Sequence, residues 1–187
     1  AADGGFAKYC VLDGDLVHVI PDSLSYEQAA LTEPAAVAVY AVRQSALKTG
    51  DTAAVFGLGP IGLLIVEALR AAGASKIYAV ELSPERQAKA EELGAIVVRP
   101  EEGETAVEAI HRLTNGGVDV SYEVTGVPVV LGQALAAVHK AGECMVVSIW
   151  EREANINPNE FAIQEKTLKG IIAYRHIFPK VLELMEQ

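Results

Sequence analysis

Three glycines, Gly57, Gly59 and Gly62, stand in G-x-G-x-x-G spacing within the stretch VFGLGPIG, and Pro60 and Ile61 lie between the last two. Such a loop, placed directly after a strand and opening a helix, lets the backbone approach a pyrophosphate. The helix N-terminus adds free N–H groups and a positive dipole end. The loop therefore predicts a dinucleotide site, which we favour over a glycine-rich turn without a ligand.

A carboxylate, Glu81, follows in the stretch YAVELSPER, at the end of the next expected strand. At this position a carboxylate accepts hydrogen bonds from the adenosine ribose hydroxyls and repels a 2′-phosphate, so we expect NAD rather than NADP. Arg86 leaves three interpretations open: it neutralises a phosphate, stacks on the adenine, or is a solvated helix residue.

Two further strand ends carry candidate ligand contacts. Thr125 and Gly126 close the stretch SYEVTG, and Val147, Ser148 and Ile149 end the strand after it. Open α/β sheets bind ligands at the carboxyl ends of their strands, so these residues are candidates for the nicotinamide half of the site. Ordinary strand-end packing explains them equally well.

Alternating strands and helices must position these residues. Short β-branched runs predict six strands, at 53–56, 76–81, 96–98, 118–123, 144–149 and 167–174. The best helix begins at Pro60 and ends at Gly73, the second begins after Ser83 and ends at Gly94, a third ends at TNGG, and a fourth spans 129–140. The expected fold is α/β, a doubly wound parallel six-stranded sheet of the Rossmann type.

The first part of the chain follows a different pattern. Segments 6–12 and 15–22 read as the two strands of a hairpin, and Ser25 with Gln28 forms a capping box that opens a helical stretch toward Gly50, interrupted by Pro34. Glu33 is the one charge in the apolar run QAALTEPAAVAVYAV. An ionised carboxylate in apolar surroundings needs a partner, so Glu33 is either a surface cap of this helix or has a specific partner.

Composition limits the classes of function. With 187 residues, of which 51% are hydrophobic, the chain can bury a substantial core. The net charge of −10 and the scattered basic residues argue against nucleic acid and anionic membranes. No apolar run reaches membrane length and no signal peptide is evident, so we expect a cytoplasmic protein. The two cysteines, Cys10 and Cys144, predict neither disulfides nor a zinc site.

Taken together, the sequence resembles the medium-chain zinc-dependent alcohol and polyol dehydrogenases, and within them the (R,R)-2,3-butanediol dehydrogenases. The segments that carry the resemblance are GGFAKYCVL, HVIPDSLSYEQAALTEPAAVAVYAV, GDTAAVFGLGPIGLL, AVELSPERQAKAEELGA, GGVDVSYEVTG, VSIW and EKTLKGIIAYRHIFP. The glycine loop occurs in many families, whereas this combination of segments is highly specific.

The resemblance implies a role for Glu33, because the corresponding glutamate of the polyol branch lies at the catalytic zinc as a ligand or close neighbour. It implies NAD and zinc as cofactors and a small diol or hydroxyketone as substrate, and Ala173, where sorbitol-type relatives carry arginine, suits a less hydroxylated diol. It also implies a β remnant of a GroES-like catalytic domain at 1–30, a Rossmann domain at 31–187, and a homodimer or tetramer paired through the last strand.

The family's zinc cysteine, its Gly-His-Glu segment and its four-cysteine lobe have no counterpart here, and the four histidines do not fall at matching positions. We therefore expect a fragment that binds NAD without turnover and whose zinc site is incomplete. Sorbitol- and threonine-type dehydrogenases of the same family, a nucleotide-sensing Rossmann module and a methyltransferase remain the alternatives.

Overall fold

Six parallel strands form a single sheet. The computed structural model describes residues 4–186. Its strands run in the order β3-β2-β1-β4-β5-β6, so the chain reverses direction across the sheet between β1 and β4. Their bounds are β1 (Thr52–Phe56), β2 (Lys76–Val80), β3 (Ile96–Val97), β4 (Val118–Glu123), β5 (Val138–Val146) and β6 (Thr167–Gly170). This is the doubly wound α/β sheet that the sequence predicts, and its switch point lies where such folds bind ligands.

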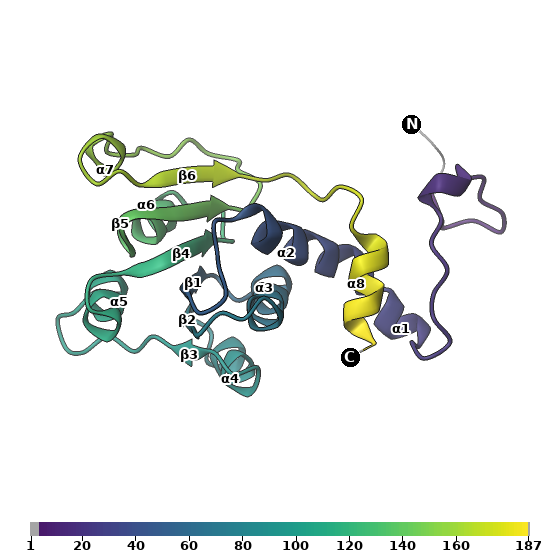
Figure 1. Ribbon diagram of the computed structural model, residues 1–187, viewed down its shortest axis with the longest axis horizontal. Helices are drawn as coiled ribbons and strands as arrows, with labels where there is room; N and C mark the ends of the chain where they lie inside the picture. The colour runs from purple at the N-terminus through teal and green to yellow at the C-terminus, as the bar shows by residue number, and fades with distance from the viewer. Residues whose placement is uncertain (1–3, 187) are drawn as a thin grey trace.

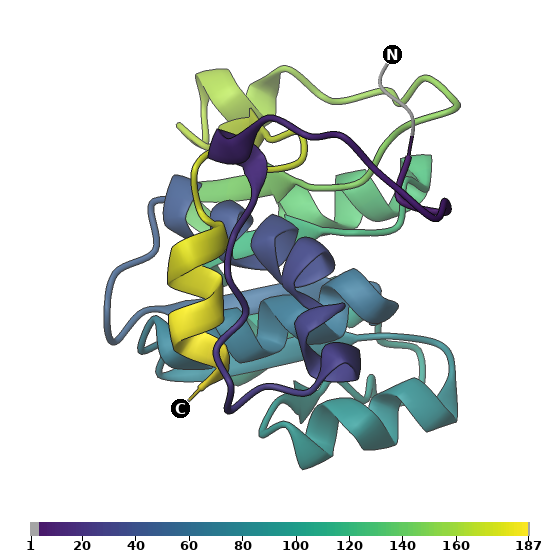
Figure 2. The ribbon, with the colours of Figure 1, turned by 90° about the vertical axis from the view of Figure 1, so that its right-hand side faces the viewer.

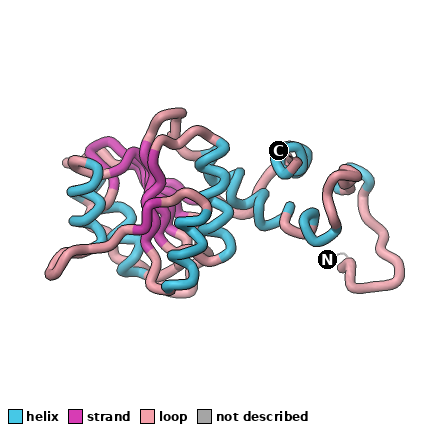
Figure 3. Tube along the Cα trace, turned by 90° about the horizontal axis from the view of Figure 1, so that it is seen from below, coloured by secondary structure: helices cyan, strands magenta, loops and turns pink. Residues whose placement is uncertain are grey.

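Helices cover both faces of the sheet, and Figure 3 shows the strands between the two helical layers. Side chains alternate along β1: Val55 packs with the layer that contains Ile65, whereas Phe56 packs with Ile110 and Leu135 on the other face. One layer holds α2 (Thr32–Gln44), α3 (Pro60–Ala71) and α4 (Pro84–Glu92), and the other holds α5 (Ala106–Thr114) and α6 (Pro128–Ala136). Both faces of β1 are therefore buried, as a central parallel strand requires.

Helix boundaries in the sheet region follow the predicted signals. Pro60 occupies the first turn of α3, and Ser83 Oγ caps α4 by accepting a hydrogen bond from the Arg86 N–H. Asn115 ends α5 in the left-handed conformation, and Gly94 follows α4 with φ +86°. These start and stop signals are confirmed, because each relies on chemistry local to the helix end.

The segment from 137 to 149 differs from the prediction. The fourth helix ends at Ala136 instead of continuing to 140, and β5 already begins at Val138 and ends at Val146. Ala141 has φ 63°, and the pairing of β4 with β5 shifts register between Val118 and Val120. A bulged strand thus absorbs residues that the sequence pattern assigned to a helix. The last strand is also shorter than expected and ends at Gly170.

The predicted N-terminal hairpin is wrong, since residues 6–22 form no strand and contain only the 3-10 turn η1 (Gly14–Leu16). An isolated two-stranded hairpin is marginal in water, and here no other strand pairs with it. The segment instead lies beside α8 (Phe178–Met185), as Figures 1 and 2 show. There the His18 ring meets the Phe178 ring edge-on, with the ring centroids 5.5 Å apart. Its apolar side chains are exposed, among them Phe6, Tyr9, Val11, Leu16 and Val19.

Between this segment and the sheet, the helical stretch is divided before Pro34 and not at it. The capping box of Ser25 and Gln28 forms as predicted and opens α1 (Tyr26–Ala29), after which α2 begins at Thr32. Pro34 fits in the first turn of α2 because its missing N–H is not needed there.

A short helix, α7 (Asn159–Ala162), precedes β6. None of the helices within residues 4–186 has the length and hydrophobicity required to span a membrane.

Candidate functional site

A cleft of about 520 Å³ opens at the carboxyl edge of the sheet. In Figure 1 the arrowheads of β4, β5 and β6 point to this edge, toward α2. The first turn of α3, the ends of β4 and β5, the start of α2 and the segment after β6 all contribute to its lining. The lining residues are Glu33, Val37, Gly59, Pro60, Ile61, Gly62, Val124, Thr125, Val147, Ser148, Ile149, Ile172 and Ala173. One cleft thus holds Glu33 together with most of the residues that the sequence nominates for cofactor binding.

The glycine loop forms one wall of this cleft, and two of its glycines have tightly packed surroundings. A Cβ on Gly62 would lie 2.0 Å from the Gly57 carbonyl oxygen, so α3 approaches the turn as closely as only glycine permits. Gly57 has φ +93°, and a Cβ there would meet the Thr125 methyl at 2.5 Å. A Cβ on Gly59 would meet nothing within 4 Å, which leaves this backbone open to the cleft. First-turn N–H groups not used by the helix face a ligand from such a position.

Glu81 lies outside the cleft lining and connects β2 to the glycine loop. Its Oε2 accepts a hydrogen bond from the Leu58 N–H at 2.8 Å, and its Oε1 accepts from Leu82 and Ser83. Burial disfavours the charged form, but these three N–H groups and Arg86 outweigh it, so the pKa of Glu81 lies below its ordinary value. Arg86 Nη1 is 3.6 Å from Oε2 and its side chain is half exposed, so this ion pair is weak. Glu81 is therefore an ionised acceptor beside the loop.

Glu33 is exposed in the first turn of α2 and faces the segment that follows β6. Burial and the nearby Glu33 carboxylate, which accepts a hydrogen bond from the Tyr174 hydroxyl, raise the pKa of Tyr174. Tyr174 in turn packs against Phe178 with ring centroids 5.0 Å apart. Ala173, next in the cleft wall, has φ 49°, in the left-handed region, and lines the cleft opposite residues of α2. The carboxylate thus has a neutral hydroxyl as its partner and keeps lone pairs free toward the cleft.

Sequence reasoning assigned no role to Glu123, although it named the segment that contains it. Glu123 is fully buried at the end of β4. Its Oε1 accepts hydrogen bonds from the Thr125 N–H at 2.6 Å, the Thr125 hydroxyl at 2.5 Å and the Gly126 N–H at 3.0 Å. Its Oε2 accepts from the Ser148 hydroxyl. The available signal was a carboxylate at a strand end, two residues before Thr125 and Gly126. Its link to Ser148 could not be seen in the sequence, because Ser148 follows the neighbouring strand.

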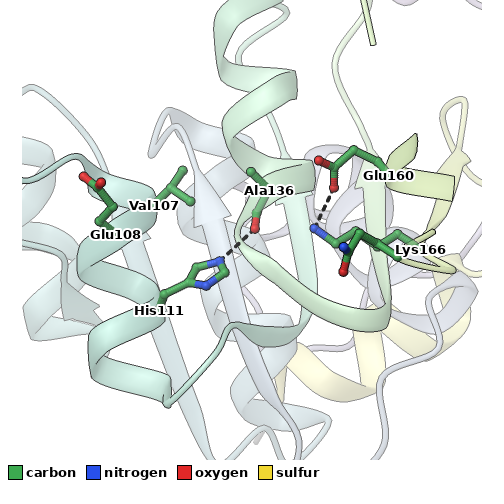
Figure 4. Close-up of a pocket in the computed structure, with 7 residues that line it drawn as sticks. Val107, Glu108, His111, Ala136, Glu160 and Lys166 are labelled. Atoms are coloured by element: carbon green, nitrogen blue, oxygen red, sulfur yellow. Dashed lines mark hydrogen bonds and ion pairs between the residues drawn. The ribbon is translucent and has the colours of Figure 1, made fainter. Parts of the chain in front are cut away.

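The described part of the chain holds no cluster of three or more His, Cys, Asp or Glu side chains that could bind a metal ion. At the opposite edge of the sheet, a second cavity of about 500 Å³ lies between α5, α6 and α7 (Figure 4). There His111 Nε2 bonds to the Ala136 carbonyl oxygen at 2.8 Å, and the buried Lys166 ammonium pairs with Glu160 at 2.8 Å and donates to the Leu135 carbonyl oxygen. These contacts satisfy carbonyl groups at the C-terminal end of α6, and Lys166 lies directly before β6.

Comparisons with known proteins agree with this arrangement. The family model for zinc-binding dehydrogenases matches residues 60–187, which include the glycine helix and every strand after it. The chain belongs to the zinc-binding dehydrogenase family. Residues 60–187 are also the part that supplies Glu81, Glu123 and the ends of β4 and β5.

Several members of this family are similar along nearly the whole chain. The (R,R)-butanediol dehydrogenase of Bacillus subtilis strain 168 is 62% identical over 98% of this chain and 53% of its own length. The sorbitol dehydrogenase of the same strain is 38% identical over 98% of this chain and 52% of its own length. The crystal structure of 2R,3R-butanediol dehydrogenase from B. subtilis superposes with a TM-score of 0.85 and 65% identity, covering 89% of this chain and 48% of that one. The chain spans about half the length of the curated relatives that it matches.

Proposed function

We propose that this chain is the NAD-binding part of a zinc-dependent dehydrogenase that transfers a hydride between NAD and a secondary alcohol or vicinal diol of the 2,3-butanediol and acetoin type. One observation carries the proposal: a single cleft brings the glycine loop, the ends of β4 and β5, and Glu33 together at the switch point. The 62% identity to a butanediol dehydrogenase supports it. By itself, the chain binds cofactor without turnover.

The proposed cofactor orientation follows from the strand order. Glu81 follows β2 on one side of β1, so the adenosine ribose lies on that side, with its hydroxyls donating to the carboxylate. The pyrophosphate lies over Gly59 and the first turn of α3, and the nicotinamide lies toward β4 and β5, near Thr125, Gly126, Val147, Ser148 and Ile149. Because Glu81 is ionised, the site prefers NAD to NADP, and Arg86 is too weakly held to reverse that preference.

Zinc would enter this site through Glu33, as a ligand or a close neighbour. A zinc ion supplies Lewis-acid polarisation of a substrate hydroxyl oxygen, which favours departure of the hydride. Within residues 4–186, Glu33 has no two further ligands beside it, so the described residues do not form the site by themselves. What the chain itself provides is the exposed Glu33 carboxylate in the cleft lining, beside the Tyr174 hydroxyl.

The preference for a small diol is supported by the cleft wall after β6. Ile172 and Ala173 line the cleft with apolar atoms where a longer polyol would require hydrogen-bond partners. A polyhydroxylated chain would leave hydroxyl groups unpaired against these two side chains. We therefore propose 2,3-butanediol and its hydroxyketone ahead of sorbitol, and rates of the whole enzyme with the two alcohols compare them directly.

The proposal is tested first by cofactor binding. Titration with NADH, followed by fluorescence and by calorimetry, should give saturable binding to this chain, and Glu81→Ala should weaken NAD more than NADP. An absence of both fluorescence change and heat would refute the NAD site, and diol oxidation by this chain alone would refute its catalytic incompleteness. Calorimetry with S-adenosylmethionine separates the methyltransferase alternative.

We also propose a homodimer or tetramer that pairs through the edge of the sheet. β6 is the outermost strand and three of its four residues are exposed, so its outer backbone groups are available for pairing. Light scattering after size exclusion should give at least twice the mass of one chain, and a monomer would count against the proposal. A cytoplasmic location is also proposed, and cell fractionation tests it.

A further inference from the structure

Glu123 is hydrogen-bonded to two loops, one after β4 and one after β5, and the nicotinamide half of the cofactor would lie against both of them. Both loops belong to the cleft wall, since Thr125 and Ser148 line it. Glu123 lies behind that wall, fully buried, and it receives hydrogen bonds from both loops. The two loops also lie close together at Gly126, where an added Cβ would be only 3.0 Å from the Ile149 carbonyl oxygen. One carboxylate therefore orients the Thr125 and Ser148 hydroxyls on this part of the wall.

A carboxylate carries lone pairs and no proton to donate, so each group bound to it must act as the donor. The Ser148 and Thr125 hydroxyls each have one proton, and both protons are directed to Glu123. Thr125 Oγ1 also accepts a hydrogen bond from the Val127 N–H at 3.1 Å. What Ser148 presents to the cleft is thus a lone pair alone. The hydroxyl can accept a hydrogen bond from a ligand but cannot give one.

We propose that Glu123 is a positioning residue that makes this wall selective for a nicotinamide over a nicotinic acid, with Ser148 Oγ accepting a hydrogen bond from the carboxamide N–H. This inference rests on the proposed NAD site and adds the chemical class that its inner end recognises. A carboxamide has an N–H to donate, whereas a ring carboxylate has only lone pairs and a negative charge. The ring carboxylate of a nicotinic acid would face the Ser148 lone pair and the buried charge of Glu123. A binding site that leaves a polar group without a partner in this way discriminates strongly against the ligand concerned.

Glu123→Gln reverses this polarity with little change in shape. The glutamine carbonyl oxygen must take the place of Oε1, where the Thr125 and Gly126 N–H groups require an acceptor. The NH₂ group then takes the place of Oε2 and donates to Ser148 Oγ. The Ser148 proton becomes free to turn toward the cleft, and the negative charge behind it is gone. The variant should therefore tolerate a nicotinic acid dinucleotide much better than the native protein does.

The experiment measures the dissociation constants of NAD and of nicotinic acid adenine dinucleotide by calorimetry. For the native protein we expect NAD to bind at least about tenfold more tightly, the equivalent of one matched hydrogen bond. In Glu123→Gln this ratio should fall below about threefold. Ser148→Ala keeps the buried charge but removes the acceptor. It should therefore weaken the binding of NAD and lower the ratio of the two dissociation constants as well.

Ser121→Ala is the matched control. Ser121 also lies on β4 and is fully buried, but its hydroxyl donates to the Ala134 carbonyl oxygen on α6, away from the cleft. Its substitution should lower the melting temperature without changing the ratio, which separates a purely structural role from control of recognition.

Three results would overturn the inference: equal binding of the two dinucleotides by the native protein, an unchanged ratio in folded Glu123→Gln, or an unchanged ratio in Ser148→Ala. The last result decides the matter if Glu123→Gln does not fold. Failure of the native protein to bind either dinucleotide is a different outcome, because it refutes the proposed NAD site itself.

Discussion

The packing of the glycine loop makes one pair of substitutions informative, because Gly59 and Gly62 lie in the same turn but in opposite surroundings. A Cβ on Gly62 would lie 2.0 Å from the Gly57 carbonyl oxygen and 3.0 Å from its carbonyl carbon. Both neighbours are backbone atoms that cannot rotate away. In Gly62→Ala, either α3 or the turn must therefore move by about 1 Å, since a carbon and an oxygen in contact stay more than about 3 Å apart.

Such overpacking costs about 1–3 kcal/mol. For a chain of 150–250 residues this corresponds to a melting temperature lower by roughly 2–12 °C. The shift also displaces first-turn N–H groups from the pyrophosphate position, so Gly62→Ala should lose both stability and NAD affinity. Thermal unfolding measures the first loss and calorimetry measures the second.

Gly59→Ala should separate the two effects. No heavy atom lies within 4 Å of the added Cβ, and the φ of Gly59 is −64°, which alanine adopts readily. The variant should unfold within about 1 °C of the native protein. Its methyl group, however, would stand where the pyrophosphate approaches the backbone, so NAD affinity should fall at least tenfold, or about 1.4 kcal/mol.

Gly132→Ala is the matched control. It lies exposed on α6, and an added Cβ there meets nothing within 4 Å. Alanine improves helix propensity by up to about 1 kcal/mol, so the control should be slightly more stable and bind NAD normally. A Gly59→Ala variant that binds NAD like the native protein would refute the placement of the pyrophosphate. A Gly62→Ala variant of native stability would refute the packing argument.

Three other predictions concern stability and reactivity away from the cofactor. Burial raises the pKa of Cys144 to about 12, so its thiol should resist alkylation at neutral pH until the protein unfolds, and rapid labelling of the native state would contradict this. Hydrogen bonds from Arg112 hold the pKa of Glu104 at about 2, below its ordinary 4.5. The contribution of this carboxylate to folding stability should therefore be complete above pH 4.5 and lost as the pH falls toward 2. In acid unfolding curves, Arg112→Met should make stability less dependent on pH in this range. Lys166→Met should lower the free energy of unfolding by about 2–3 kcal/mol in denaturant, because it leaves Glu160 and the Leu135 carbonyl without their partner. Lys140→Met breaks an exposed pair with Glu165 and should lower it by less than about 0.5 kcal/mol. Equal losses in the two variants would contradict the role of burial.

The parts of the fold that sequence reasoning predicted well are those fixed by local chemistry. Pro60 and Gly73 bracket α3, Ser83 caps α4, and Asn115 ends α5, each through atoms within a few residues. The doubly wound parallel sheet of six strands was also predicted, because helices alternating with short apolar strands leave few parallel arrangements. The glycine spacing predicted the turn for the same reason, since only glycine fits at Gly57 and Gly62.

Errors arose where a local pattern competed with its surroundings. Alternating apolar residues in 6–22 suggested a hairpin, but a strand pair needs a sheet or core to cover it. Within residues 4–186 no strand pairs with this segment, and its His18 ring packs against Phe178 of α8. Residues 138–140 read as the end of a helix, yet the left-handed Ala141 and the register shift place them in a bulged β5. The role of Glu123 also required the third dimension, because Ser148 reaches it from the neighbouring strand.

Glu33 lines the cleft and Glu123 is buried behind its wall, and these different surroundings give the two carboxylates different roles. A carboxylate offers about four lone-pair sites, and Glu123 fills its sites with donors from its own chain, so it cannot bind a ligand directly and acts through the groups that it orients. Glu33 is exposed and its partner among the described residues is the Tyr174 hydroxyl, which leaves acceptor sites open to the cleft. A cation or a donor hydroxyl entering the cleft would therefore be held by Glu33, while the ring amide would be read through Ser148. Exchange of Glu33 for Gln should accordingly leave the preference for NAD over its nicotinic acid analogue unchanged, and a change in that ratio would show that the two carboxylates are not independent.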